Sequence, residues 1–337
     1  MRVAWIAILL CCLLVSCNEV VYLRNDEKPV LVLYAVLEAG SDSMRIELTE
    51  TKGTYDKSPW QRFPEAEVRV YEEGELLGMA EYQPADSSFV LRQPVKAERT
   101  YRIEAQVAGK ATVWGETHVP KRLENYHLEC WYVNENDFLS FSCDTVRYRW
   151  QDISGERNNY WLRVNYTRTY RKECTSTDTC MINWSDTLNW KLASLQCSSN
   201  LPDPFNRVYA EIEDVGFYSV YSEYIRVEDS GLDGQKIELI CNPEFYGGGY
   251  FFKVLVVLMH ADQHLDAYQK SAIDWQNNAF PFDGEMTWTL HHVPIYSNVH
   301  GGAGLVGSYV PMETVLRIWN LDEAEEGAVF GPGERVK

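Results

Sequence analysis

The amino-acid sequence predicts an all-β protein made of two β-sandwich domains, with one amphipathic helix in the second domain. Three observations support this prediction. Short segments with alternating apolar and polar residues follow one another from residue 29 onward, separated by turn residues. Residues 249–260 are apolar on both faces, which is typical of a strand buried inside a sheet. Residues 261–278 repeat apolar side chains at helical spacing instead.

The first predicted domain, residues 29–120, has the strand pattern of an immunoglobulin- or transthyretin-like sandwich. The segment "PVLVLYAVLEA" at 29–39 starts it, and Glu73 and Gly74 form a turn between two later strands. The turns recur at short, regular spacing, as they do in β-sandwiches. The apolar positions that alternate with polar ones are Met44, Ile46, Leu48, Val68, Val70, Tyr101, Ile103 and Ala105.

The second predicted domain, residues 121–322, is also β-rich but less regular. Its helix at 261–278 is expected to pack on the sandwich through a stripe formed by Leu265, Tyr268, Ala272 and Trp275. Residues 323–337 are polar or rich in Gly and Pro, and we expect them to form a flexible tail.

The N-terminal segment has the features of an export signal. Arg2 precedes the apolar run "VAWIAILLCCLL", which is too short for a permanent transmembrane helix. The following "LVSC" resembles a bacterial lipobox, which implies a signal peptide at 1–16 and a palmitate-type lipid anchor on Cys17. Residues 17–28 would then be a lipidated tether.

The remaining cysteines fit an exported protein, because an even number suits disulfides in an oxidising compartment. Cys130 and Cys143 flank a predicted hairpin that would place them opposite each other. Cys174 and Cys180 flank a tight loop, while Cys197 and Cys241 remain as a third pair or as free thiols. The candidate disulfide residues are therefore Cys130, Cys143, Cys174, Cys180, Cys197 and Cys241.

The charge of the chain excludes one class of partner. Lys and Arg number 31 against 49 Asp and Glu, which gives a formal net charge of −18. Such a surface repels phosphate backbones, so we expect no nucleic-acid partner. After the signal there is no apolar run of about eighteen residues. We therefore expect attachment to a membrane through the lipid on Cys17 alone.

The segment 302–307 contains a literal G-x-G-x-x-G, formed by Gly302, Gly304 and Gly307, with Asp322 and Glu323 about twenty residues further on. A dinucleotide-binding fingerprint needs a helix directly after the glycines. Pro311 falls where the interior of that helix would be, and proline disrupts helices. We expect the glycines to serve a tight turn and close backbone packing, and we expect no cofactor.

Two further patterns resemble metal sites weakly. His260 and His264 have the spacing of a helical metal pair, but no Glu follows the first His as it does in metalloproteases. His291 and His292 would point to opposite sides of a strand. The stretch "DSGLDG" at 229–234 has acidic spacing like a calcium loop but lacks the terminal Glu, which favours a simple turn. We expect no metal.

Several stretches resemble a known family of Bacteroidota outer-membrane lipoproteins, the domain of unknown function DUF4249. They are "VLVLYAVLEAGSDSMRIELTET", "FPEAEVRVYEEGELLG", "RYRWQDISGERNNYWLRV", "HLDAYQKSAIDWQNN" and "IYSNVHGGAGLVGSY". The resemblance covers nearly the whole chain after the signal. It implies an accessory protein of an outer-membrane TonB-dependent transporter, and it carries no catalytic residues.

The sequence thus predicts a non-enzymatic, lipid-anchored outer-membrane protein that docks on a TonB-dependent transporter, or a similar assembly, and helps capture a ligand. The prediction leaves open a periplasmic or a cell-surface location, and it names no ligand. Three alternatives remain open: a free-standing glycan- or peptide-binding lipoprotein, a fimbria-like structural subunit, and a hydrolase. Neither a G-x-S-x-G elbow nor a phosphate-binding loop is present to support the last of these.

Overall fold

The computed structural model describes residues 28–53, 56–131, 145–169, 191–192, 194–198, 225–229, 231–244, 251–279, 294–318 and 328–330. This part of the chain consists mostly of strands, with one described helix, α3 (Gln263–Ala279). The prediction of an all-β sandwich fold with an amphipathic helix after residue 260 is confirmed for the described residues.

The described strands form three sheets. The nine-stranded sheet has the order β12 (Lys191–Leu192), β11 (Asn159–Thr169), β16 (Phe251–Ala261), β17 (Ala303–Ile318), β1 (Leu31–Glu38), β2 (Met44–Glu50), β6 (Ser88–Leu91) and β5 (Glu81–Gln83), and β14 (Ile225–Glu228) also pairs with β11. The five-stranded sheet has the order β13 (Ser194–Ser198), β15 (Lys236–Glu244), β10 (Thr145–Gln151), β9 (Tyr126–Trp131) and β18 (Ala328–Phe330). The four-stranded sheet has the order β4 (Glu75–Met79), β3 (Glu67–Glu72), β7 (Thr100–Gln106) and β8 (Val113–His118).

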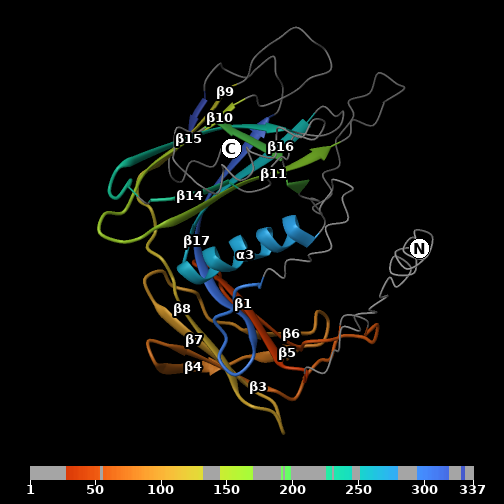
Figure 1. Cartoon of the computed structure of the whole chain (residues 1–337). Coiled ribbons are helices and arrows are strands. Elements are labelled where there is room, and N and C mark those ends of the chain that lie inside the picture. The colour runs from red at the N-terminus through yellow and green to blue at the C-terminus, as the bar shows by residue number, and fades with distance from the viewer. Residues whose placement is uncertain are drawn as a thin grey trace, which may run out of the picture.

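The nine-stranded sheet is the centre of the molecule. The four-stranded sheet lies at the lower end in Figure 1 and the five-stranded sheet at the upper end, while α3 crosses the middle beside β17. One continuous apolar core contains Val70 of the four-stranded sheet, Leu33 and Leu258 of the central sheet, and Leu239 of the five-stranded sheet. The two smaller sheets therefore pack on the same face of the central sheet.

Strand β1 shows why the alternating sequence forms this arrangement. Leu31, Leu33, Ala35 and Leu37 are buried in the core between the sheets, and the intervening residues face the other way. Burial of each of these leucines contributes about 1.5–3 kcal/mol, and the smaller Ala35 contributes less. Strand β1 pairs in parallel with β17, so the central sheet joins strands from both predicted domains. The boundary at residue 120 stays a prediction.

Strand β16 is buried on both faces, as its sequence predicted. Leu258 belongs to the core between the sheets, whereas Met259 belongs to a second cluster under α3. Leu265 of the helix lies in that second cluster, and Tyr268 packs against it. Trp275 was predicted to belong to the same stripe, but it is 47% exposed, so the stripe ends before it.

The glycine segment confirms close backbone packing rather than a nucleotide-binding turn. Residues 303–318 form strand β17, so the helix that a dinucleotide site requires is replaced by a strand. Gly304 has φ +121°, and a Cβ at this position would lie 2.0 Å from the carbonyl oxygen of Leu33. A Cβ on Gly302 would lie 2.4 Å from the carbonyl oxygen of Leu31. These glycines let β17 approach β1.

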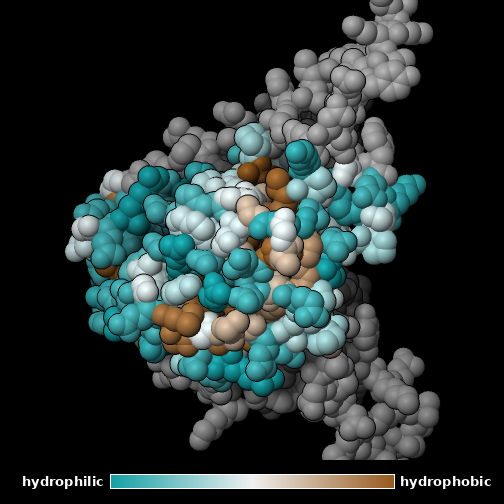
Figure 2. Space-filling view, turned by 90° about the horizontal axis from the view of Figure 1, so that it is seen from below, coloured by the Kyte–Doolittle hydropathy of each residue, from teal (hydrophilic) through white to brown (hydrophobic). Residues whose placement is uncertain are grey.

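Two surface features complete the fold. Figure 2 shows a mostly hydrophilic lower face on which hydrophobic residues gather in small areas. Leu76 and Met79, on the edge strand β4, are among the exposed large apolar side chains. Residues 328–330, within the expected flexible tail, form β18 and pair with β9.

Candidate functional site

A polar cleft of about 400 Å³ lies where the four-stranded sheet meets the end of β16. Its walls come from β8, from residues 156–158 between β10 and β11, and from the junction of β16 with α3. Three histidines line it, His118, His260 and His264, together with the acidic residues Glu116, Glu156 and Asp262. The cleft therefore brings together segments that are far apart in the sequence.

Asp262 holds the walls of the cleft together. Its Oδ1 accepts hydrogen bonds from the backbone N–H groups of Leu265, at 2.8 Å, and Ser308, at 3.2 Å. Its Oδ2 accepts a hydrogen bond from the Thr117 hydroxyl at 2.7 Å. Asp262 is thus the N-cap of α3, which explains why the helix begins at Gln263. Burial raises the pKa of this carboxyl group above its ordinary value, although the three hydrogen bonds oppose the shift.

His260 is 3% exposed and lines the cleft. Its Nδ1 lies 2.8 Å from the carbonyl oxygen of Lys121. A carbonyl only accepts, so Nδ1 carries the proton and the neutral ring keeps an acceptor lone pair on Nε2. Burial lowers the pKa of His260, which favours this neutral form. No described residue forms a hydrogen bond with Nε2.

The other two histidines are also held through Nδ1. Nδ1 of His264 lies 2.7 Å from the Tyr296 hydroxyl oxygen, and Nδ1 of His118 lies 3.1 Å from the Thr100 hydroxyl oxygen. His260 belongs to β16 and His264 to α3, so the pair does not have the helical geometry that its spacing suggested. His291 and His292 lie outside the described residues.

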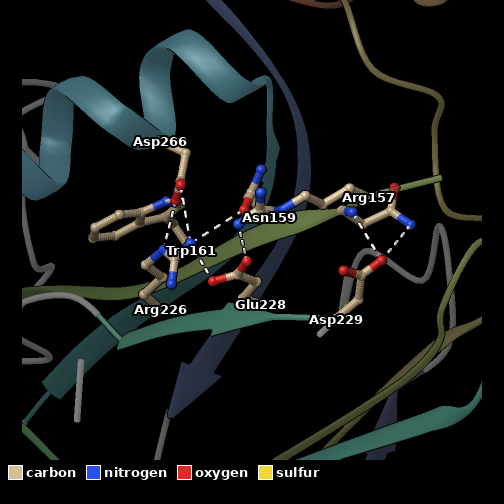
Figure 3. Close-up of polar contacts among 8 residues, drawn as sticks. Arg157, Asn159, Trp161, Arg226, Glu228, Asp229 and Asp266 are labelled. Carbon is tan, nitrogen blue, oxygen red and sulfur yellow. Dashed lines mark hydrogen bonds and ion pairs between the residues drawn. The ribbon is translucent and has the colours of Figure 1, made fainter. Parts of the chain in front are cut away.

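Behind the cleft, a buried ion pair connects α3 to the central sheet. Arg226 of β14 donates from Nε to Asp266 Oδ1 at 2.6 Å and from Nη2 to Asp266 Oδ2 at 3.0 Å (Figure 3). Nη2 also contacts Asn159 Oδ1 at 3.2 Å and Glu228 Oε2 at 3.0 Å. Trp161 donates from Nε1 to Asp266 Oδ1 at 3.0 Å. The guanidinium, which is 1% exposed, is therefore surrounded by acceptors.

The charges in this network are mutually stabilised. Burial disfavours the charged form of Arg226, but hydrogen bonds and attraction to Asp266 and Glu228 outweigh it and raise its pKa. Burial raises the pKa of Glu228, and the contacts with Arg157 and Arg226 reverse this and lower it overall. Arg157 lines the cleft and pairs with Glu228, so the network reaches the cleft wall (Figure 3).

A cluster of three carboxylates lies on the other side of Asn158. Oxygens of Asp152, Asp229 and Asp233 all lie within 4.8 Å of one another. Asp229 and residues 231–234 show the predicted turn, with Leu232 N–H donating to the Asp229 carbonyl at 2.6 Å. Asp152 joins it from the end of β10, and no described Lys or Arg forms a salt bridge with the cluster. Carboxylate oxygens are ligands that Ca²⁺ prefers, and three are gathered here.

Burial and hydrogen bonds distinguish the members of this cluster. Tyr160 donates to Asp152 Oδ1 at 2.7 Å and Gly234 N–H to Asp152 Oδ2 at 2.8 Å. Asn158 N–H donates to Asp229 Oδ2 at 2.9 Å. Burial raises the pKa of Asp229, and repulsion from Asp152 and Asp233 adds to this shift.

The structure describes the backbone of three candidate cysteines, Cys130, Cys197 and Cys241. Cys197 of β13 and Cys241 of β15 are direct register partners in antiparallel strands. Strands β9 and β10 pair as the expected hairpin, but Cys130 lies opposite Val146, so the expected register with Cys143 is wrong. Cys17, Cys143, Cys174 and Cys180 lie outside the described residues.

The sequence patterns did not predict most of the polar residues whose hydrogen bonds hold the cleft and the buried ion pair. Thr117 and Arg226 lie in strands and Asn158 lies in a loop, and no local sequence pattern marks any of the three. Asp262 had a signal, because an Asp directly before an amphipathic run is typical of a helix N-cap. Among the described helices, none is both long and apolar enough to cross a membrane.

Comparison with known families gives one clear match. The model of the family described as a domain of unknown function, DUF4249, matches residues 18–314. No curated protein matches the chain. Since the family model covers most of the sequence, the chain belongs to the DUF4249 family.

Proposed function

We propose that the protein is a lipid-anchored accessory protein of the bacterial outer membrane, in a Bacteroidota-type lipoprotein family. It has no enzymatic activity, docks on a TonB-dependent transporter and helps that transporter capture a ligand. The observation that carries this proposal is the position of the family domain. The match begins at residue 18, directly after the "LVSC" segment that resembles a lipobox and ends in Cys17.

The structure supports a binding role for the folded part. The cleft lies between segments that the buried hydrogen bonds of Asp262 hold in place, as a preorganised binding site requires. The oxygens of Asp262 are used in these bonds, so the most buried carboxylate of the cleft acts as a structural group. His260 lies beside it in the lining, and no described residue bonds to its Nε2 acceptor. A free-standing binding lipoprotein would use the same cleft, and is the second candidate.

The experiment is affinity purification of the tagged full-length chain from detergent-solubilised outer membranes, followed by identification of the bound proteins. A stoichiometric TonB-dependent transporter is the expected result. The matched control is Cys17→Ser, which removes the lipid attachment site and leaves the folded part unchanged. If purified transporter retains the Cys17→Ser chain in detergent, docking is a protein contact and not shared residence in a micelle. An empty column with wild-type chain overturns the accessory role.

A further inference from the structure

We infer that the cleft formed by β8, residues 156–158 and the β16–α3 junction binds a small organic cation, an amine with several N–H donors. The inference rests on the lining residues, on the free acceptor of His260 and on the charge balance of the cleft. It deepens the ligand-capture part of the proposed function by naming the chemical class of the ligand.

The hydrogen bonds of His260 indicate which groups a ligand of the cleft can contact. His260 lines the cleft, is almost fully buried and has Nδ1 committed to the Lys121 carbonyl, which leaves Nε2 as the acceptor of its neutral ring. A ligand that reaches Nε2 can donate a hydrogen bond to it. A ligand with N–H donors therefore fits this part of the cleft.

The lining of the cleft carries negative charge that described basic residues do not neutralise. Glu116 and Glu156 line the cleft, and neither forms an ion pair with a described residue. Arg157 is the only Lys or Arg among the described lining residues, and Glu228 neutralises it. Among the described lining residues, an anionic ligand would find no unpaired Lys or Arg, whereas a cation finds two carboxylates without an ion-pair partner.

The described lining residues suit neither a sugar nor a hydrophobic ligand. No Trp, Tyr or Phe is among the described lining residues, so the large aromatic rings on which sugars usually stack are not found among them. Pro120 and Ala261 are the only apolar residues among the described residues that line the cleft, which disfavours a wholly hydrophobic ligand.

The spacing of the acceptors in the cleft favours an organic cation over a metal ion. A metal requires ligand atoms close together around one point. Within the described residues, the only group of three close His, Cys, Asp or Glu ligands is Asp152, Asp229 and Asp233, none of which lines the cleft. Acceptors spread over a cleft of about 400 Å³ instead suit an elongated amine with separated N–H groups.

The test is isothermal titration calorimetry of the purified full-length chain, in a non-ionic detergent, with spermidine as the probe. The uncharged diol of the same chain length is the control ligand. We expect saturable one-site binding of spermidine and none of the diol. The measurement uses the chain without a partner, so its outcome is independent of transporter co-purification.

Three variants make the test specific to the cleft. His260→Asn keeps a donor near the position of Nδ1 and removes the Nε2 acceptor, and we expect about three- to tenfold weaker binding. Glu156→Gln removes one exposed charge of the cleft, and we expect about tenfold weaker binding. Glu65→Gln removes an equal charge from an exposed residue outside the cleft and should leave the affinity unchanged.

The outcomes decide between a built site and general attraction to an acidic protein. Equal weakening by Glu156→Gln and Glu65→Gln, with no effect of His260→Asn, would show that spermidine only follows the net charge and would overturn the inference. No saturable binding by the folded wild-type chain would overturn it as well. Because Glu156 is exposed, its variant tests the inference even if His260→Asn fails to fold.

Discussion

Asp266 of α3 accepts two hydrogen bonds from the guanidinium of Arg226 in β14, at 2.6 and 3.0 Å, inside a nearly closed interior. This bidentate contact, together with the bond from Trp161, fixes the helix on the central sheet. A buried charge without its partner is costly, so the pair makes the position of the helix strongly dependent on both residues.

We therefore expect Asp266→Asn to lower the free energy of unfolding by about 3–5 kcal/mol, because it leaves the Arg226 charge buried and poorly compensated. The double variant Arg226→Met with Asp266→Leu should recover most of this loss, since it removes both charges. Urea denaturation followed by tryptophan fluorescence measures both effects. A double variant as unstable as the single one would contradict this explanation.

Gly304 should tolerate no side chain. A Cβ there would lie 2.0 Å from the Leu33 carbonyl oxygen, so Gly304→Ala must push β17 away from β1. Gly40 is the matched control, because it also has a positive φ, +88°, but has no atom within 4 Å of an added Cβ. We expect Gly40→Ala to cost about 1 kcal/mol, and Gly304→Ala to cost clearly more. Thermal unfolding of the two variants provides the comparison, and equal costs would show that the close approach is unimportant.

His260 should make stability depend on pH. Its folded-state pKa is lowered mainly by burial, so the unfolded chain binds a proton more readily. Stability is then fully present above the unfolded pKa, about 6.5, and is lost as the pH falls below it. We expect the wild-type chain to lose more stability between neutral pH and about pH 5 than His260→Asn does. Denaturation midpoints at a series of pH values measure this, and parallel curves would contradict the prediction.

Cys197 and Cys241 should form a disulfide after export. Direct partners in an antiparallel ladder have Cα atoms about 4.5–5.5 Å apart, within the range that disulfides span. We expect mass spectrometry of unreduced peptides to find the two cysteines linked, and reduction to release them. Detection of both as free thiols in protein taken from the envelope would contradict the pairing.

The sequence predicted those parts of the fold in which a local pattern determines burial. The alternation in residues 31–38, the two-sided apolar run before His260 and the helical spacing after it correspond to β1, β16 and α3. Each pattern is local because a strand or helix buries its own face. The helix ends at Ala279, within one residue of the prediction, but its buried stripe is shorter than predicted, since Trp275 continues the helical spacing and yet is 47% exposed.

The long-range contacts of the site had no such local pattern. Arg226 and Asp266 are forty residues apart, and Asp152 meets Asp229 only because the ends of two sheets converge. The parallel pairing of β1 with β17 likewise joins two distant segments, for which only the glycines at 302 and 304 gave a local indication. Contacts of this kind depend on topology, which alternation alone does not determine.

The most direct test of the central claim is native mass spectrometry of the detergent-purified, tagged full-length chain from outer membranes. We expect a species whose mass equals one lipidated chain plus one TonB-dependent transporter. A lipidated chain that appears only by itself, from membranes in which the transporters are intact, would contradict the accessory role.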